Sequence, residues 1–456
     1  MLLAALALPL MIQSTPYEEP LRPQFHFTAK AGWLNDPNGL AFFGGEYHLF
    51  FQHNPFGTQW GNMTWGHAVS PDLVHWRQID HAIEPDRLGT IFSGSAVVDV
   101  ANTSGLGTVG KPALVCIYTA AGGTNEASKG QPFTQCLASS TDGRIFAKLP
   151  DNPVLGHLEA ENRDPKVLWH EPTGKWVMAL FLDGNRYALL GSKDLRAWTR
   201  LSTVEMPGAS ECPDFFELPV VGDRGRMKWV FWGGSGRYRV GSFDGTTFTP
   251  ETESIPTNFG NTGYAAQTYF NDPNGRRVQI AWHNNANFPG TAWNQELGIP
   301  TELTLVSTPD GPRLRIHPVS ELARLHGPLV KEQGSGWFPV ESGLIDATVS
   351  LEVPPTGTLA LVANGQRITY DAPSHDLKCL DRSVRVAPVE GRLRLRVLVD
   401  RASLEIFAQE GAVSMPIFAL PVDGPRGLRV ERTGAWTGEV KVYPLNSAWP
   451  AHGGAR

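Results

Sequence analysis

Short apolar runs separated by turn residues dominate the pattern of hydrophobic and polar positions along the chain. Examples are the runs at 65–69, 166–169, 264–270 and 277–282. Runs of this length that are bounded by Gly, Pro, Asn or Asp are typical of β-strands. The 48 Gly and 36 Pro provide many tight turns, and the 14 Trp and 22 Phe provide flat apolar faces. We therefore predict an all-β protein.

One turn pattern, Ser-x-Asp-[Leu/Gly]-x-x-[Trp/Phe], occurs four times, each time after a strand-like run. The copies begin at Ser70, Ser140, Ser192 and Ser242, so their spacings are 70, 52 and 50 residues. This spacing matches one β-propeller blade with loop insertions, and Asp-Leu or Asp-Gly turns the chain into the next strand. The alternative is a common surface turn that recurs by chance. The shared closing aromatic residue argues against that alternative.

The chain has 456 residues, more than the roughly 250–300 that one hydrophobic core supports, so at least two domains are expected. Five blades would occupy residues 20–310. From about Leu325 onward, polar and apolar positions alternate more regularly, as at 392–399 and 403–407. This alternation predicts a β-sandwich at 328–450, and we expect a linker at 311–327 that contains a short helix at 319–325.

The apolar run at 2–12, followed by polar residues, resembles the hydrophobic core of a signal peptide. No Lys or Arg precedes it, so either the start of the signal is truncated or the run is an ordinary buried strand. We predict a signal peptide at 1–15 and a secreted or periplasmic protein. About 20 apolar residues are needed to span a bilayer, and neither this run nor a later one is that long. We therefore expect no membrane span.

The formal net charge of −6, without any Lys/Arg run, argues against binding to nucleic acid and favours a neutral substrate. The four cysteines are too few and too scattered for a disulfide framework or a zinc site. Cys116 and Cys136 could form one disulfide or remain as two core thiols. The 13 His include no metal-binding motif, so we expect no metal and no cofactor. The sequence leaves the oligomeric state open.

Three acidic residues, Asp36, Asp164 and Glu211, lie far apart in the chain in distinct short motifs. Asp164 and Glu211 each stand just ahead of a strand-like run, where propeller blades face the central pocket. Hydrolysis of a glycosidic bond needs two carboxyl groups in unlike environments, and a third can orient the sugar hydroxyls. We therefore predict that the three carboxylates converge on one sugar. We also expect burial beside Cys212 and Pro213 to raise the pKa of Glu211.

Each motif also has a plainer interpretation. Asn-Asp-Pro-Asn-Gly is a turn sequence, and a hairpin explains its second copy at 271–275, so we assign no chemistry to Asp272. The first copy, at 35–39, differs because Trp33 precedes it and an aromatic stretch follows it. Arg163-Asp164 could be a surface ion pair.

Five motifs, in order, resemble glycoside hydrolase family 32, which contains the invertases, inulinases and levanases. The motifs are 33–39 (WLNDPNG), 56–67 (FGTQWGNMTWGH), 92–95 (FSGS), 163–165 (RDP) and 211–213 (ECP). The resemblance covers nearly all of the chain, because 400–407 also resembles the family's closing sandwich motif. It implies a five-bladed propeller that carries the catalytic site, followed by a β-sandwich.

The resemblance implies that Asp36 is the nucleophile, Glu211 the acid/base and Asp164 the transition-state stabiliser of a retaining glycosidase. The activity implied is release of terminal β-D-fructofuranosyl units from levan, inulin or sucrose. A fructosyltransferase and a non-catalytic carbohydrate-binding protein remain alternatives. Further positions match the family's fructose pocket or offer apolar walls to it; they are Trp33, Asn35, Gln52, Trp60, Phe92, Ser93 and Arg163, with Trp282 or Trp293 closing the far side.

Overall fold

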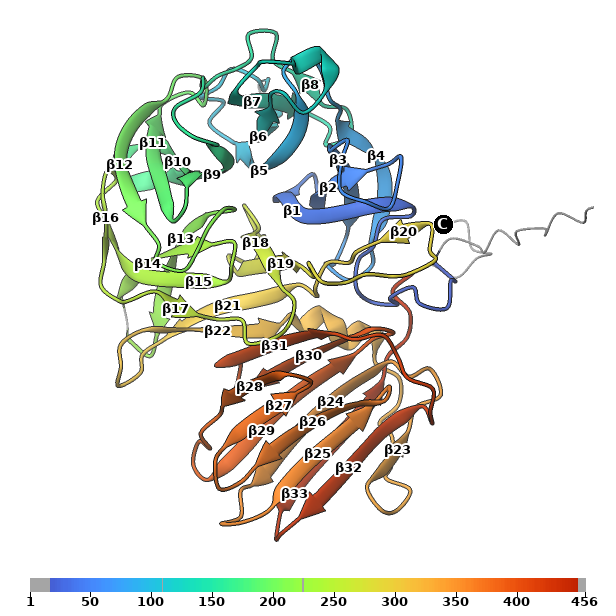
Figure 1. Cartoon of the computed structure of the whole chain (residues 1–456). Coiled ribbons are helices and arrows are strands. Elements are labelled where there is room, and N and C mark those ends of the chain that lie inside the picture. The colour runs from blue at the N-terminus through green and yellow to red at the C-terminus, as the bar shows by residue number, and fades with distance from the viewer. Residues whose placement is uncertain (1–16, 109, 224, 450–456) are drawn as a thin grey trace, which may run out of the picture.

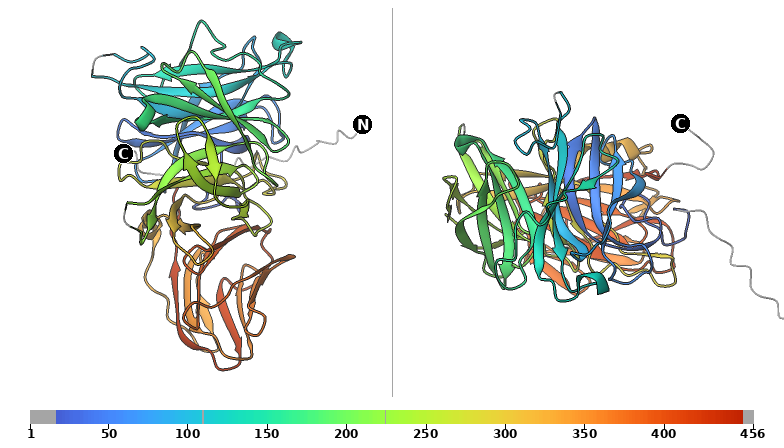
Figure 2. Two further views of the ribbon diagram at one scale, coloured as in Figure 1. Left: turned by 90° about the vertical axis from the view of Figure 1, so that its left-hand side faces the viewer. Right: turned by 90° about the horizontal axis from the view of Figure 1, so that it is seen from above.

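A computed structural model describes residues 17–108, 110–223 and 225–449 of the chain. The predicted signal peptide at 1–15 lies outside these residues. Figure 1 shows a ring of small sheets above an elongated pair of sheets, and Figure 2 shows the same two parts from the side and from above. The predicted fold class, an all-β propeller followed by a β-sandwich, is confirmed. Among the described residues, no helix is long and apolar enough to cross a membrane.

The described strands of the propeller sort into five antiparallel four-stranded groups, and the short strands β17 (Ile255–Pro256) and β20 (Trp293–Asn294) pair at their sides. The first strands contact one another in a closed ring, from β1 to β5, β9, β13, β18 and back to β1. The groups are β1 (Gly32–Phe43), β2 (Glu46–Asn54), β3 (Thr64–Ser70) and β4 (Arg77–Ile83); β5 (Thr90–Asp99), β6 (Ala113–Ala121), β7 (Phe133–Ser140) and β8 (Ala147–Lys148); β9 (Arg163–His170), β10 (Lys175–Asp183), β11 (Arg186–Ser192) and β12 (Thr199–Glu205); β13 (Asp214–Val221), β14 (Met227–Gly233), β15 (Arg237–Phe243) and β16 (Phe248–Pro250); and β18 (Tyr264–Thr268), β19 (Arg277–Trp282), β21 (Thr301–Val306) and β22 (Arg313–Pro318).

Each copy of the repeated turn pattern joins the third strand of a group to the fourth. In all four copies, one oxygen of the Asp accepts hydrogen bonds from the backbone N–H groups two and three residues further along. The four acceptors are Asp72, Asp142, Asp194 and Asp244. This Asx-type turn reverses the chain tightly, and the pattern occurs in four of the five groups, the last group being the exception.

The predicted linker differs from the structure. Residues 313–318, which we placed in the linker, form β22 and pair with β21 in the propeller sheet. Their alternation explains this pairing, because Leu314 and Ile316 are buried while their neighbours are partly exposed. The short helix expected at 319–325 is present as the 3₁₀ helix η3 (Ser320–Leu325).

Two stacked sheets form the sandwich, with one apolar core between them. One sheet contains β23 (Trp337–Pro339), β32 (Gly427–Thr433), β25 (Thr358–Ala363), β26 (Gln366–Asp371), β27 (Asp376–Cys379) and β28 (Arg382–Arg385). The other contains β31 (Val413–Phe418), β30 (Ser403–Ala408), β29 (Arg392–Val399), β24 (Ile345–Glu352) and β33 (Thr437–Pro444). In β29 the Arg side chains alternate with buried Leu side chains, as expected for a sheet with one face in a core.

Cys116 and Cys136 lie on the paired strands β6 and β7, as predicted. Both are buried free thiols, so the structure has two core thiols and no disulfide between Cys116 and Cys136.

The sandwich and the propeller share a hydrophobic core, because Leu398 and Phe407 pack in the same cluster as propeller residues. A buried polar cluster crosses the same interface. His26 Nδ1 lies 2.9 Å from Asp400 Oδ2, and His26 Nε2 lies 3.0 Å from Glu405 Oε1. Burial alone would lower the pKa of His26, but the hydrogen bonds to Asp400 and Glu405 raise it to about 10. The two parts are therefore joined by a buried, charged contact as well as by apolar packing.

We expect a chain that ends at residue 327 to accumulate as insoluble protein. The truncation removes the partners of His26 and exposes the propeller's share of the common core. Solubility and thermal unfolding should be compared with those of the full chain and of His26→Ala. This milder variant breaks only the buried charge contact, so it should still fold, with a loss of about 3–5 kcal/mol. A soluble, active truncated chain would contradict the expectation.

Candidate active site

All five strand groups contribute to one cavity of about 180 Å³ that contains Asp36, Asp164 and Glu211. The sequence prediction that these carboxylates converge therefore agrees with the structure. The other side chains that line the cavity are Asn35, Gln52, Trp60, Phe92, Ser93, Arg163, Cys212, Tyr264 and Trp282.

Asp36 lies within β1, inside the first of two register shifts in the pairing of β1 with β2, the one between Leu34 and Pro37. Such bulges bend a strand and re-aim its side chains, so the turn-forming sequence 35–39 becomes part of an irregular strand. Ser93 Oγ donates to Asp36 Oδ2 at 2.6 Å, and Asn35 Nδ2 donates to Asp36 Oδ1 at 3.2 Å. Burial raises the pKa of Asp36, although these two donors oppose the rise.

Asp164 is buried at the start of β9 and has a φ of +61°, a left-handed conformation that non-glycine residues rarely adopt. The backbone N–H of Cys212 donates to Asp164 Oδ2 at 3.1 Å. Burial raises the pKa of Asp164 to about 7; Arg163 opposes this rise, whereas the nearby Asp36 and Glu211 charges add to it.

Glu211 precedes β13 and receives two short hydrogen bonds. Tyr264 Oη donates to Glu211 Oε2 at 2.5 Å, and Arg163 Nη2 donates to Glu211 Oε1 at 2.6 Å. Burial raises the pKa of Glu211, but these two donors outweigh it and the net shift is downward. Our expectation of a raised pKa was wrong for the free pocket, because the sequence does not reveal either donor.

Cys212 is a contact that sequence reasoning missed, because we treated it only as an apolar neighbour. Its Sγ lies 3.5 Å from both Asp36 Oδ2 and Asp164 Oδ2, so the thiol is placed between two carboxylates. Glu211 and Cys212 are consecutive residues with positive φ, at +53° and +37°. These unfavourable backbone conformations occur next to the cavity, and they determine where the side chains of Glu211 and Cys212 point.

Aromatic rings and one unpaired amide complete the cavity. The rings of Trp60 and Phe92 meet edge to face at 5.9 Å, and Trp282 lines the wall formed by β19. Gln52 Nε2 is buried without a hydrogen-bond partner among the described residues, so it is free to donate to a bound hydroxyl.

Two Trp residues predicted to contact substrate do not line the cavity. Trp33 Nε1 donates to Asn35 Oδ1 at 2.9 Å, so Trp33 orients the amide that faces Asp36. Trp293 is fully buried elsewhere, with the Arg22 guanidinium 4.0 Å above its ring and Phe288 against it. Of the alternatives Trp282 and Trp293, only Trp282 lies at the pocket.

Comparisons with known proteins match the whole architecture. The model of the glycosyl hydrolases family 32 N-terminal domain matches residues 26–318, and the model of the family's C-terminal domain matches residues 348–444. A levanase from Bacillus subtilis is 35% identical over 96% of this chain and 72% of its own. An extracellular exo-inulinase from Aspergillus niger is 32% identical over 95% of this chain and 96% of its own. The crystal structure of exo-inulinase from Aspergillus awamori superposes with a TM-score of 0.84 at 28% identity, over 95% of this chain and 100% of the other.

Proposed function

This chain belongs to glycosyl hydrolase family 32, and we propose that it is a β-fructosidase that releases terminal β-D-fructofuranosyl units from fructans, or from sucrose. The similarity to a levanase and to exo-inulinases over nearly the whole chain supports fructan hydrolysis rather than fructosyl transfer. The observation that carries the proposal is the cavity in which Asp36, Asp164 and Glu211 meet. A carbohydrate-binding protein would not need all three carboxylates.

We assign Asp36 as the nucleophile, Glu211 as the acid/base and Asp164 as the group that binds the sugar hydroxyls in the transition state. Asp36 attacks the anomeric carbon while Glu211 protonates the departing oxygen, which leaves a fructosyl-enzyme. Glu211 then removes a proton from water, and the resulting hydroxide releases fructose with net retention. Ser93 and Asn35 hold the Asp36 carboxylate, and Arg163 and Tyr264 hold Glu211.

The proton must be redistributed before the bond breaks. In the free pocket the pKa values of Asp36 and Asp164 are raised and that of Glu211 is lowered, which is the reverse of the order that the proposed roles require. The proposed roles require the proton on Glu211. A bound sugar places hydroxyl donors against the aspartates, which favours their ionised forms, and it displaces water from Glu211, which favours the neutral acid. Substrate binding therefore prepares the catalytic protonation state.

Chromatography of the products from levan, inulin and sucrose tests the proposal. We expect fructose to accumulate with time from at least one of the three, and the fastest release to identify the preferred linkage. At high sucrose concentration a hydrolase yields glucose and fructose in equal amounts, whereas a transferase yields excess glucose and longer oligosaccharides. If none of the three substrates is cleaved, the non-catalytic binding protein becomes the better interpretation.

We further propose that the protein is secreted or periplasmic. The Aspergillus relatives are extracellular exo-inulinases, and the apolar run at 2–12 has the length of a signal-peptide core. An exported hydrolase would meet fructan polymers that are too large to enter a cell.

A further inference from the structure

The segment 257–263, between β17 and β18, lies along the edge strand β31 of the sandwich. Phe259 N donates to Ser414 O at 3.0 Å, and Asn261 N donates to Pro416 O at 3.1 Å. The side chain of Asn261 extends this pairing, because its Nδ2 donates to Phe418 O at 3.0 Å and its Oδ1 accepts from Phe418 N at 2.9 Å. The segment thus binds β31 as a further strand would.

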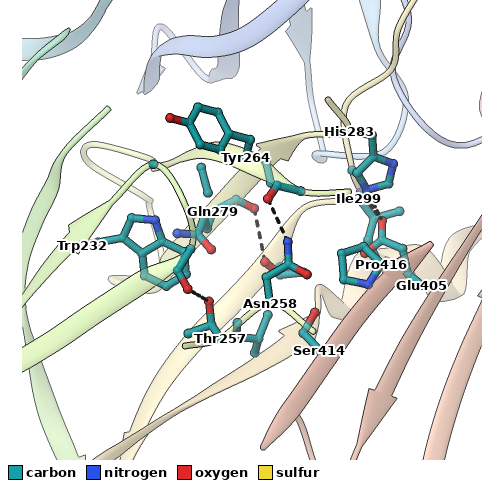
Figure 3. A pocket seen from close by; sticks show the side chains of 18 residues that line it. Trp232, Thr257, Asn258, Tyr264, Gln279, His283, Ile299, Glu405, Ser414 and Pro416 are labelled. Atoms are coloured by element: carbon teal, nitrogen blue, oxygen red, sulfur yellow. Dashed lines mark hydrogen bonds and ion pairs between the residues drawn. The ribbon is translucent and has the colours of Figure 1, made fainter. Parts of the chain in front are cut away.

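The segment 257–263 also packs closely against the sandwich. A Cβ atom on Gly260 would lie 1.7 Å from Pro416 O, so the two backbones approach more closely than any side chain would permit. The ring of Phe259 packs against the sandwich core. Within the segment, Asn258 Nδ2 donates to Thr262 O and Gly263 O, which fixes the turn back towards β18. Figure 3 shows Asn258 beside Ser414 and Pro416, with Tyr264 at the far side of the same small cavity.

The residue that follows the segment is Tyr264, whose hydroxyl donates to Glu211 at 2.5 Å. In Figure 3 this hydroxyl points away from the cavity that the segment lines. A backbone path runs in parallel, because Ala265 N donates to Gly234 O at 2.8 Å and Gly234 N donates to Glu211 O at 3.0 Å. The sandwich edge is therefore connected to Glu211 through continuous hydrogen bonds and one short segment.

We infer that strand β31 of the sandwich positions Tyr264 against Glu211 through the segment 257–263, so that the C-terminal sandwich takes part in catalysis. This inference rests on the proposed function, in which Glu211 is the acid/base. Tyr264 and the Asn residues of the segment are positioning residues. The sandwich thereby acquires a role beyond covering the apolar underside of the propeller.

The segment and β31 contain no titratable side chain, so they act on Glu211 through the placement of Tyr264 and of the parallel backbone path, and not through a charge of their own. The charged and titratable groups that face Glu211 are Arg163, Asp36, Asp164, Cys212, Tyr264 itself and Tyr187, whose hydroxyl donates to Glu211 O at 3.2 Å. Loss of the Tyr264 hydrogen bond removes a donor to the ionised carboxylate, so the pKa of Glu211 rises. Because the acid must be protonated, activity is lost as the pH rises through this pKa. A higher pKa therefore moves the basic limb of the pH profile to higher pH.

The test is the pH dependence of kcat, which reports the enzyme–substrate complex, in the full-length variants Asn261→Ala, Tyr264→Phe and the double variant. We expect each single change to move the basic limb upward by about 1–2 pH units. The double variant should move it no further than Tyr264→Phe alone, because both changes remove the same contact. Gly260→Ala provides a second route, since it keeps every hydrogen-bonding side chain but forces the segment away from Pro416.

Arg315→Ala is the matched control. Arg315 Nη1 donates to Gln409 O at 2.7 Å, so its loss weakens the same domain interface without removing a hydrogen bond of the segment, although Arg315 lines one cavity with Thr257 and Phe259. This variant should lower Tm and leave the pH profile unchanged. If Asn261→Ala and Gly260→Ala lower Tm but keep the native profile, the inference is wrong.

A failure of the proposed function is distinguishable from a failure of this inference. A native chain that releases no fructose at any pH rejects the function. The carboxyl pKa of Glu211, followed by NMR in the native chain and in Asn261→Ala, would still rise in the variant if β31 positions Tyr264, and would stay constant if it does not.

Discussion

Asp36→Asn is expected to abolish fructose release, with kcat lower by roughly 10⁴-fold. The amide is nearly the same size as the carboxylate and can keep its contact with Ser93, but it cannot form a fructosyl ester with the anomeric carbon. Substrate binding should persist, because Gln52, Arg163 and Asp164 remain in place. Initial rates with sucrose, together with calorimetric binding of fructose, separate the loss of kcat from a loss of binding.

The chain offers a matched control in its second Asn-Asp-Pro-Asn-Gly sequence. Asp272→Asn makes the same substitution in the same five residues, at a buried site where Asp272 accepts from Tyr47 and Arg276 outside the cavity. We expect this variant to lose stability and to keep its kcat. Equal loss of kcat in both variants would mean that the effect of Asp36→Asn is a folding defect, and the nucleophile assignment would fall.

The propeller was predictable from the sequence because its repeating element is local. The Asp side chain of each turn bonds to backbone groups two and three residues away, so the sequence alone determines the turn. The end of the propeller was not predictable in the same way. Residues 313–318 form β22, which pairs with the preceding strand β21 as a hairpin, but the turn between these two strands lacks the repeated pattern, so the pattern did not mark the fourth strand of the last group.

In the candidate site, too, the features encoded by local motifs were predictable and those that depend on the assembled fold were not. Asp36, Asp164 and Glu211 were identified because each stands in a distinctive motif, but the contacts of Cys212 and Tyr264 depend on how the blades meet. Tyr264 comes from β18 in the fifth group and reaches a residue ahead of β13 in the fourth. The positive φ values at Glu211 and Cys212 could not be predicted from the residue types, since neither residue is a glycine.

The pKa of Glu211 was mispredicted because contacts between blades cannot be identified from the sequence. Neighbouring apolar residues alone predict a raised value, whereas two donors from distant parts of the chain reverse the direction. The choice between Trp282 and Trp293 was open for a similar reason. Both are aromatic residues of the same region, and only the course of the chain after β19 buries Trp293 beside Arg22.

Glu211→Ala is expected to slow sucrose hydrolysis by roughly 10²–10⁴-fold, because both protonation of the leaving oxygen and deprotonation of water lose their catalyst. Asp36 is retained, so a substrate with a leaving group that needs no proton, such as an aryl β-fructofuranoside, should still form the fructosyl-enzyme. Azide attacks this intermediate without a base, so added azide should restore turnover and yield a β-fructosyl azide. Liquid chromatography with mass detection measures both the rate and this product.

The azide product distinguishes the role of Asp36 from that of Glu211, independently of how far each substitution lowers the rate of hydrolysis. Azide can replace the missing carboxylate of Asp36→Asn only by attacking the anomeric carbon directly, because no fructosyl-enzyme forms without the nucleophile, so the product is an azide of inverted configuration. Rescue of Asp36→Asn with an azide product of retained configuration would instead exchange the two assignments, because azide would then have intercepted a fructosyl-enzyme formed on another carboxylate. Absence of rescue in Glu211→Ala, in a variant that still binds fructose, would show that Glu211 does not act in the second step. A single-displacement mechanism would then fit the cavity better than the retaining one.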